Sequence, residues 1–218
     1  MLAMTMTRAV AIAALAGGAT LPAAPDAPPI SPVATQDTAV FAGGCFWGIQ
    51  AVFARVKGVV SATAGYAGAR LASPSYEEVS TGTTGYAESV RVIYDPGKVS
   101  YDQLLAVFFA VHDPTELNRQ GPDEGTQYRS AVFFRNATQQ QAATAYIARL
   151  GQAHTFKHPV VTQVAPVSSF HRAEEYHQDY YDKNPDNPYI VINDKPKVGE
   201  LKARFPQLFT ASPAPPEP

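Results

Sequence analysis

The sequence predicts an α+β fold of the ferredoxin-like, split βαβ kind: a two-layer sandwich in which helices cover one face of a mainly antiparallel mixed sheet, with long coil extensions. Alternating or short continuous apolar runs predict strands at 39–41, 59–66, 88–94 and 128–134. Apolar residues at spacings of three and four predict helices at 46–56 and 100–111. The resulting order of strand, helix, strand, strand, helix, strand is that of the split βαβ plan.

The first strand ends at Gly43-Gly44, a pair that favours a tight turn. The helix after it places five apolar residues on one face: Phe46, Ile49, Val52, Phe53 and Val56. Lys57-Gly58 predicts the end of this helix. Cys45 is thereby predicted in the first helical turn.

The second half of the plan rests on local signals of the same kind. Val90, Val92 and Tyr94 alternate with more polar neighbours, as in a half-buried strand. Ser100, with Gln103 three residues on, forms a capping-box pattern at a helix start. The remaining expectations are one helical turn at 76–79, a long polar and functional loop at 112–130, a helix at 138–151, a strand at 160–167, coil at 184–197 and a closing helix at 198–205.

The ends of the chain look separable from one catalytic domain at 37–208. Residues 1–27 have Arg8, a short alanine-rich apolar run and then small residues, which is the layout of a secretory signal peptide. We therefore expect export, periplasmic or secreted, and no membrane span after processing; an unprocessed cytoplasmic protein is the alternative. Residues 28–36 read as a flexible linker and 209–218 as a disordered Pro-rich tail.

Composition excludes several classes of function. The formal net charge is −2, and the basic residues are scattered, so we expect no nucleic-acid partner. Cys45 is the only cysteine in the sequence, which rules out an intramolecular disulfide and a cysteine-cluster metal site. No long apolar stretch argues for a dimer, and we expect a monomer.

Cys45 lies at a helix start, between a glycine turn and the aromatic pair Phe46-Trp47. Unpaired N–H groups and the helix dipole favour a thiolate there, and the thiolate is the nucleophile. The alternative is that Cys45 is a small buried hydrophobe, as free cysteines often are.

Several segments in this order resemble the A-type peptide methionine sulfoxide reductases, and the resemblance spans about residues 35–208. The main matching segments are GGCFWG at 43–48, GYAG at 65–68, YEEV at 76–79, 82–88, YDP at 94–96, HDPT at 112–115, LNRQG at 117–121, Asp123, GTQYRS at 125–130, AE at 173–174 and YHQ at 176–178. The resemblance implies reduction of methionine (S)-sulfoxide, free or in proteins, and hence repair after oxidative damage.

The resemblance also implies roles for individual residues. Cys45 is the nucleophile that becomes a sulfenic acid, and Glu88 is the acid that protonates the departing oxygen. The substrate-binding residues it implies are Phe46 and Trp47 for the S-methyl group, Tyr76 and Tyr128 for the sulfoxide oxygen, and Asp123. For each of these, ordinary packing or exposure is the alternative.

The chain departs from the family pattern in having no second cysteine to attack the sulfenic acid, and Ser80 stands where some members have one. We therefore expect an external thiol reductant (thioredoxin, glutaredoxin or a small thiol) and no bound cofactor. Tyr86 replaces a histidine and Pro122 an asparagine. The group His171, Glu175 and His177 is a poor metal site by spacing, and we expect no metal.

Two other functions compete. A cysteine hydrolase would pair Cys45 with a histidine base, but Ala42 occupies the place where the papain-type signature has a second cysteine. A non-catalytic ferredoxin-like module would leave Cys45 incidental.

Overall fold

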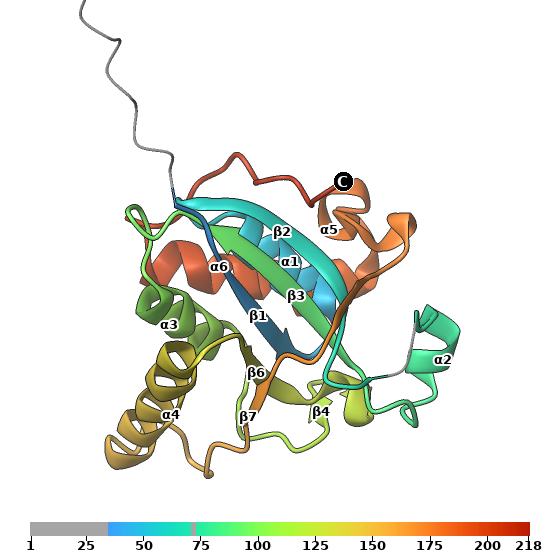
Figure 1. Cartoon of the computed structure of the whole chain (residues 1–218). Coiled ribbons are helices and arrows are strands. Elements are labelled where there is room, and N and C mark those ends of the chain that lie inside the picture. Colours follow the sequence, from blue (N-terminus) through green and yellow to red (C-terminus); the bar gives the residue numbers. More distant parts are fainter. Residues whose placement is uncertain (1–34, 71–72) are drawn as a thin grey trace, which may run out of the picture. The chain divides into compact units, whose positions relative to one another are not determined.

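The fold is built on a six-stranded mixed sheet in the order β7-β6-β1-β3-β2-β8 (Figure 1). Neighbouring strands are antiparallel except for the parallel pair β6 and β7. The strands are β1 (Asp37–Gly43), β2 (Val59–Ala67), β3 (Ala87–Tyr94), β6 (Ser130–Phe134), β7 (Gln163–Pro166) and β8 (Phe170–Arg172). A separate hairpin pairs β4 (Arg119–Gln120) with β5 (Asp123–Glu124).

This computed structural model describes residues 35–70 and 73–218. The expected signal peptide and all of the linker except residues 35 and 36 lie outside the described residues. The expected catalytic domain lies within them apart from residues 71–72.

Helices pack on one face of the sheet. The helices are α1 (Phe46–Ala54), α2 (Tyr76–Ser80), α3 (Tyr101–Val111), α4 (Ala137–Gln152), α5 (Tyr180–Lys183) and α6 (Lys195–Arg204), with short 3-10 turns at Thr126–Tyr128 and Glu175–His177 and a π-helix at Ile190–Asp194. α1 lies against β1, β2 and β3, and α6 packs on α1 and α3. The structure confirms a mixed α and β architecture around a mixed sheet.

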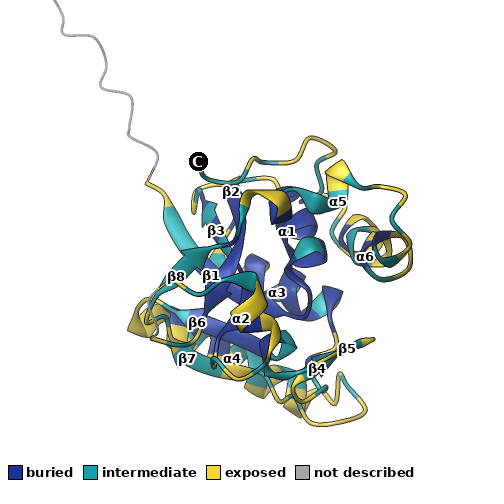
Figure 2. Ribbon diagram, turned by 90° about the vertical axis from the view of Figure 1, so that its right-hand side faces the viewer, coloured by how far each residue is buried: buried dark blue, intermediate teal, exposed yellow. Residues whose placement is uncertain are grey.

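Alternation along the strands decides which side chains face the helices. On β3, Val90, Val92 and Tyr94 join the main core with α1 and α3, and Ala87 joins a smaller cluster on the opposite face. The central strands and α1 are dark blue, that is buried, in Figure 2. Glu88 shares the parity of Val90, so its side chain points toward the helices.

Two predicted helix starts are confirmed in detail. Ser100 caps α3 and Gln103 completes the capping box. The turn predicted at 76–79 is α2, capped in the same way by Ser75 and Glu78. Each box satisfies backbone N–H groups that a helix start leaves unpaired.

Other boundaries differ from the expectation. α1 ends at Ala54, before the predicted end at Lys57-Gly58, because Val56 leaves the helix and pairs with Phe209. The segment 128–134 enters the sheet only at Ser130. The predicted coil at 184–197 is wrong, since the π-helix and the start of α6 occupy residues 190–197.

The tail at 209–218, expected to be disordered, instead lies along α1 and β2. The N–H of Thr210 donates to Arg55, that of Ala214 to Ala54, and that of Ala62 to Pro215. The Glu217 carboxylate accepts from Arg91 at 2.5 Å. The pattern-based expectation missed these long-range contacts, because a Pro-rich segment can be ordered by backbone hydrogen bonds that no local periodicity reveals.

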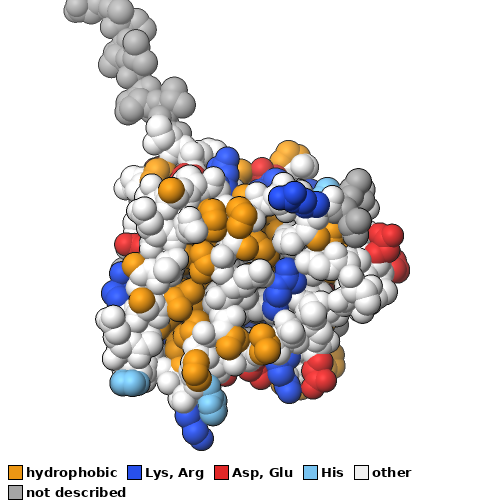
Figure 3. Space-filling view, turned by 60° about the horizontal axis from the view of Figure 1, so that its bottom comes forward, with side chains coloured by type: hydrophobic (Ala, Val, Ile, Leu, Met, Phe, Trp, Pro, Cys, Tyr) orange, Lys and Arg blue, Asp and Glu red, His pale blue; other side chains and the backbone are white. Residues whose placement is uncertain are grey.

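The surface carries no concentrated basic patch on the face drawn in Figure 3, where hydrophobic side chains form a band and Lys and Arg side chains lie apart from one another. No helix among the described residues is long and apolar enough to cross a membrane.

Candidate active site

Cys45 sits at the junction between β1 and α1, as the N-cap residue of α1 rather than inside its first turn. The turn before it depends on Gly44, whose φ of +87° is unfavourable for other residues. A Cβ on Gly44 would also lie 2.5 Å from Cβ of Gln120, so the loop carrying β4 closes directly over this turn. Cys45 is buried, with only 7% of the residue exposed.

Glu88, at the start of β3, is brought to the same place. Its Oε2 accepts a hydrogen bond from the N–H of Phe46, the residue after Cys45, at 3.0 Å. Burial raises the pKa of Glu88 to about 8, against the lowering effect of that N–H. A carboxyl group that holds its proton near neutral pH can act as an acid.

The electrostatics of Cys45 differ from the expectation. Burial, followed by the carboxyl groups of Glu88 and Asp194, raises the pKa of the thiol well above its ordinary value. Lys197 and the N–H of Trp47 lower it, but by less. The helix start therefore does not by itself yield a stable thiolate, and the resting form is the thiol.

The aromatic pair after Cys45 separates into one core residue and one partly exposed residue. Phe46 is buried between Tyr66 and His177, with ring centroids 5.9 and 4.9 Å away. Trp47 stacks on Tyr180 at 3.8 Å and meets Tyr189 edge-on at 5.9 Å. Trp47 therefore presents an apolar surface next to Cys45.

Tyr76 begins α2, and Tyr128 lies in the 3-10 turn before β6; both are half-buried. Burial, and then the nearby Glu88, raises the pKa of each hydroxyl. Both tyrosines therefore stay protonated at neutral pH and can donate hydrogen bonds close to Cys45 and Glu88.

Asp123, on the β4–β5 hairpin, accepts a short hydrogen bond from the hydroxyl of Tyr189. Burial raises the pKa of Asp123, and the Tyr189 hydroxyl and Lys197 oppose that rise. Tyr76 and Tyr128 both lie close enough to Cys45, Glu88 and Asp123 for their charges to interact, and Phe46 and Trp47 directly follow Cys45. The structure thus brings together all seven residues singled out in the sequence. Figure 2 views the molecule from the side of α2 and the hairpin.

Sequence reasoning missed the residues that the C-terminal region contributes. Tyr189 fell in predicted coil, and so did Asp194 and Lys197, which form a buried ion pair at 2.9 Å. A Cβ on Gly48 of α1 would lie 2.1 Å from Oδ1 of Asp194, so this pair packs directly on the helix after Cys45.

One histidine that could serve a hydrolase as its base is hydrogen-bonded to groups other than Cys45. The ring nitrogens of His112, a candidate base for a hydrolase, contact the carbonyl of Phe108 and the hydroxyl of Ser130. Within 35–70 and 73–218, no group of three or more His, Cys, Asp or Glu residues is placed to hold a metal ion.

Comparison with known proteins identifies the family. A sequence model described as peptide methionine sulfoxide reductase matches residues 37–208. The chain is 54% identical over 179 residues to peptide methionine sulfoxide reductase MsrA 2 of Mesorhizobium japonicum, covering 82% of this chain and 92% of that protein. It is 44% identical over 187 residues to MsrA 2 of Synechocystis sp., covering 84% and 87%.

Solved structures agree. Reduced Mxr1 from Saccharomyces cerevisiae superposes with a TM-score of 0.64 at 34% identity, over 71% of this chain and 89% of that one. Methionine sulfoxide reductase A of Corynebacterium diphtheriae superposes with a TM-score of 0.63 at 35% identity, over 70% and 76%. The chain therefore belongs to the peptide methionine sulfoxide reductase family, A type, and is an oxidoreductase that reduces methionine (S)-sulfoxide and so repairs oxidised proteins.

Proposed function

We propose that Cys45 and Glu88 act as a coupled pair in this reduction, with Glu88 as the acid and proton carrier. One observation carries the proposal: the buried Glu88 carboxyl, with its pKa raised to about 8, is hydrogen-bonded to the N–H of Phe46, directly after the nucleophile. An acid that is protonated at the working pH and lies beside the nucleophile meets both requirements of general acid catalysis.

The first step balances without any other group. Glu88 gives its proton to the sulfoxide oxygen and then takes the proton of the Cys45 thiol. The thiolate sulfur attacks the activated sulfur, so that an S–S bond forms as the methionine S–O bond breaks and the oxygen leaves as hydroxide. The hydroxide then attacks the Cys45 sulfur, the S–S bond breaks, and methionine is released. Methionine is reduced, Cys45 is oxidised to the sulfenic acid, and no net proton is consumed. The raised pKa of both groups fits this order, because each starts in its neutral form.

The substrate is held by groups around that pair. The hydroxyls of Tyr76 and Tyr128 donate hydrogen bonds to the sulfoxide oxygen as negative charge develops on it. Asp123, which accepts a hydrogen bond from Tyr189, is a further substrate-binding residue beside these tyrosines. Phe46 and Trp47 enclose the S-methyl group.

An external thiol completes the cycle. Cys45 is the only cysteine in the sequence, so a thiol from thioredoxin, glutaredoxin or a small molecule attacks the sulfenic acid, and water leaves. A second thiol then attacks the mixed disulfide, which restores Cys45 and releases the donor as a disulfide. No bound cofactor enters this scheme.

The purified protein should be given both sulfur epimers of a methionine sulfoxide peptide with dithiothreitol, beside a Cys45→Ser variant. We expect reduction of the S epimer alone and none by the variant. With substrate and no thiol, mass spectrometry should find Cys45 carrying one added oxygen and turnover stopping after one cycle. Sustained turnover without thiol would contradict external resolution, and an active Cys45→Ser variant would contradict the role of Cys45.

We infer further that the domain follows the split βαβ plan. The order β6-β1-β3-β2 with α1 and α3 on one face supports this, and β7 and β8 are then edge additions.

We also propose that the protein is exported and works as a monomer, after removal of residues 1–27. The layout of that segment supports export. Amino-terminal sequencing of the protein from an export-competent host should find a new start within residues 17–28, and an intact Met1 would contradict it. Light scattering should give the mass of one chain.

A further inference from the structure

Asp194 and Lys197 form an ion pair against the first turn of α1. Nζ of Lys197 donates to Oδ1 of Asp194 at 2.9 Å, and Asp194, the last residue of the π-helix, is fully buried. The side chain of Lys197, in the first turn of α6, is only 12% exposed. Taking both charges out of water costs stability that their attraction does not reliably return. Stability alone therefore does not explain this pair.

Gly48 adds a second cost at the same place. It lies in the first turn of α1, close to Cys45, although glycine is unfavourable inside a helix. A Cβ at this position would lie 2.1 Å from Oδ1 of Asp194 and 3.0 Å from Cδ of Lys197. Any larger residue would therefore push the pair away. The glycine lets the two charges approach the helix start that carries Cys45.

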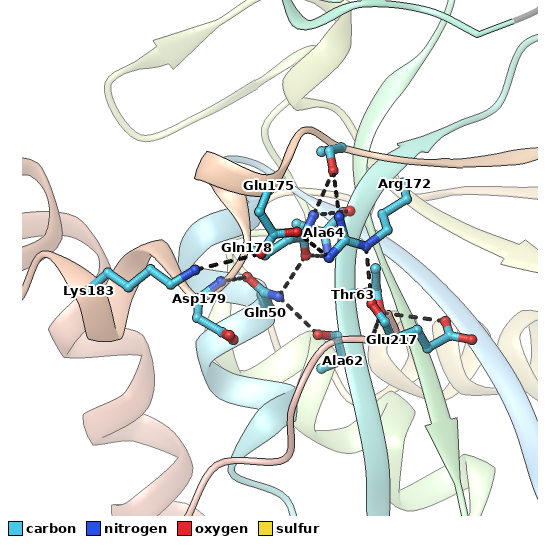
Figure 4. Close-up of polar contacts among 11 residues, drawn as sticks. Gln50, Ala62, Thr63, Ala64, Arg172, Glu175, Gln178, Asp179, Lys183 and Glu217 are labelled. Atoms are coloured by element: carbon cyan, nitrogen blue, oxygen red, sulfur yellow. Dashed lines mark hydrogen bonds and ion pairs between the residues drawn. The ribbon is translucent and has the colours of Figure 1, made fainter.

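Gln178 shows, by contrast, how a buried polar side chain can be fully satisfied (Figure 4). Its Nε2 donates to the carbonyls of Ala64 and Ala173. Its Oε1 accepts from the N–H of Ala64 and from the amide of Gln50. Among the described residues, Oδ2 of Asp194 is instead buried without a hydrogen-bond partner. The ion pair is thus not explained by polar satisfaction either.

The charges of the pair act on the proposed reactive groups. Burial, and then the carboxyl groups of Glu88 and Asp194, raises the pKa of the Cys45 thiol, and Lys197 opposes that rise. Burial likewise raises the pKa of Glu88 and that of Asp123, and Lys197 again opposes it. The ammonium therefore lies where the proposed reaction develops negative charge, first on the Cys45 sulfur and then on the leaving hydroxide.

The other titratable groups near the sulfur or the ammonium are neutral at neutral pH. Burial raises the pKa of three hydroxyls and lowers that of one imidazole, and these groups belong to Tyr76, Tyr128, Tyr189 and His112. Burial also raises the pKa of Asp194, but the ammonium 2.9 Å away opposes that rise. Among these groups, Lys197 is the only cation.

We propose that Asp194 and Lys197 are a positioning pair that sets the reactivity of Cys45. The Lys197 ammonium stabilises the negative charge that passes through the Cys45 sulfur. Asp194 holds the ammonium in place and limits how strongly it activates the thiol. This inference rests on the proposed role of Cys45 as the nucleophile. Neither side chain of the pair exchanges atoms with the substrate, so both act through Cys45.

Cys45 is the only cysteine in the sequence, so alkylation by iodoacetamide reports on this thiol alone. The reagent is uncharged, and its rate therefore follows the fraction of thiolate rather than attraction to the site. The test compares Lys197→Met, Lys197→Arg and Asp194→Asn with Lys195→Met, at an exposed lysine of the same helical turn. The readouts are the alkylation rate against pH, and kcat and KM with a methionine sulfoxide peptide and dithiothreitol.

In Lys197→Met we expect alkylation at neutral pH to be about tenfold slower and kcat to fall by a similar factor, with little change in KM, because a charge beside the sulfur is lost. Lys197→Arg keeps the charge and should recover most of both rates. Asp194→Asn should have the opposite effect on the thiol, with alkylation about tenfold faster. Lys195→Met should match the parent.

Opposite signs separate this role from a structural one, because loosened packing would change the alkylation of both variants in the same direction. If loss of one buried charge unfolds the protein, the double variant Asp194→Asn/Lys197→Met removes both and leaves no unpaired charge. Asp194 has the larger effect of the two on the thiol. The double variant should therefore alkylate faster than the parent, but more slowly than Asp194→Asn.

Parental alkylation and kcat in Lys197→Met, or changes of the same sign in Lys197→Met and Asp194→Asn, would overturn the role of the pair. A double variant that alkylates no faster than the parent would do the same. Cys45→Ser separates this inference from the proposed function. If Cys45→Ser is active, the proposed function is wrong; if it is inactive while Lys197→Met behaves like the parent, only the role of the pair is wrong.

Discussion

Two regions of the chain form the active site in different ways. The first, from β1 to β3, carries Cys45 and Glu88 on a strand-turn-helix unit and a central strand. The second, from β8 to the end of α6, carries His177, Tyr189 and Asp194 on short and irregular elements. In the proposed function, the first region supplies the groups that exchange atoms with the substrate, and the second packs against those groups and their neighbours. The proposed reactive groups thus lie at the N-cap of a regular helix and on a central strand, whereas the residues packed on them lie on short, irregular elements.

The largest effect should come from the first region, through Glu88→Gln. Loss of the acid should lower kcat/KM by about 10²–10⁴-fold. Glu88→Gln should nevertheless fold, because glutamine can still accept from the N–H of Phe46. A kcat/KM within threefold of the parent would contradict the acid role.

The same variant has a signed effect on stability. Folded Glu88 keeps its proton up to about pH 8, whereas the unfolded chain releases it near pH 4.5, so the folded state binds more protons in that interval. Stability contributed by this group is therefore lost as pH rises from 4.5 to about 8. Denaturant unfolding should show that a shift from pH 5 to pH 8.5 lowers the free energy of unfolding of Glu88→Gln less than that of the parent.

The enzymatic activity of the parent should also fall as the pH rises through about 8, because Glu88 then loses the proton that it donates.

The contact between the two regions can be broken at Gly48. In Gly48→Ala the new Cβ would meet Oδ1 of Asp194 at 2.1 Å, and overpacking of this kind costs about 1–3 kcal/mol in the free energy of unfolding. Gly151→Ala in α4 is the control, since its Cβ would meet nothing within 4 Å. Equal changes in the free energy of unfolding of the two variants would show that the packing of Asp194 on α1 does not contribute to stability.

The regular first region could be predicted from the sequence further than the irregular second region. The turn at Gly43-Gly44, the face of α1 and the parity of Glu88 with Val90 follow from periods that extend over several residues. These local patterns place Glu88 on the correct strand and Cys45 at the correct junction, although Cys45 is the N-cap residue of α1 and not part of its first turn. They left the burial of Cys45 open as an alternative, because the raised pKa of its thiol depends on that burial and on carboxyl groups from segments outside the local pattern, Glu88 and Asp194.

The second region lacks such periods. Pro188 and Pro196 flank the π-helix and argue against a continuous helix, although proline is tolerated in the first turn of α6. The tail is ordered by hydrogen bonds to Ala54, Arg55 and Thr63, which are more than 150 residues away. Long-range contacts of this sort leave no mark on the local pattern, so Tyr189 and Glu217 could be found only in the structure.

A smaller effect is expected from Tyr189→Phe in the second region. Loss of its hydroxyl removes the hydrogen bond that lowers the pKa of Asp123, so this pKa should rise, and kcat/KM should fall about tenfold, which is the worth of one charge-assisted bond. Tyr181→Phe, whose ring faces Arg55, is the control. If both variants keep parental activity at every pH, the support that Tyr189 gives to Asp123 is unimportant for catalysis.

The smallest effect should come from Glu217→Gln at the end of the tail. Its carboxylate accepts from Arg91 and from the hydroxyl of Thr63, and both members of the ion pair with Arg91 are partly exposed, at 30% and 25%. Exposed pairs contribute about 0.2–1 kcal/mol, and salt screens them. We therefore expect a slightly lower melting temperature at low salt, a difference that shrinks at high salt, and unchanged kcat. Glu200→Gln, on the exposed side of α6, should show neither change.

A fall in the kcat of Glu217→Gln would mean that the tail contributes to activity as well as to stability. Arg172 donates hydrogen bonds both to the Glu217 carbonyl and to Glu175, so such a fall would indicate that the tail also holds the segment bearing His177.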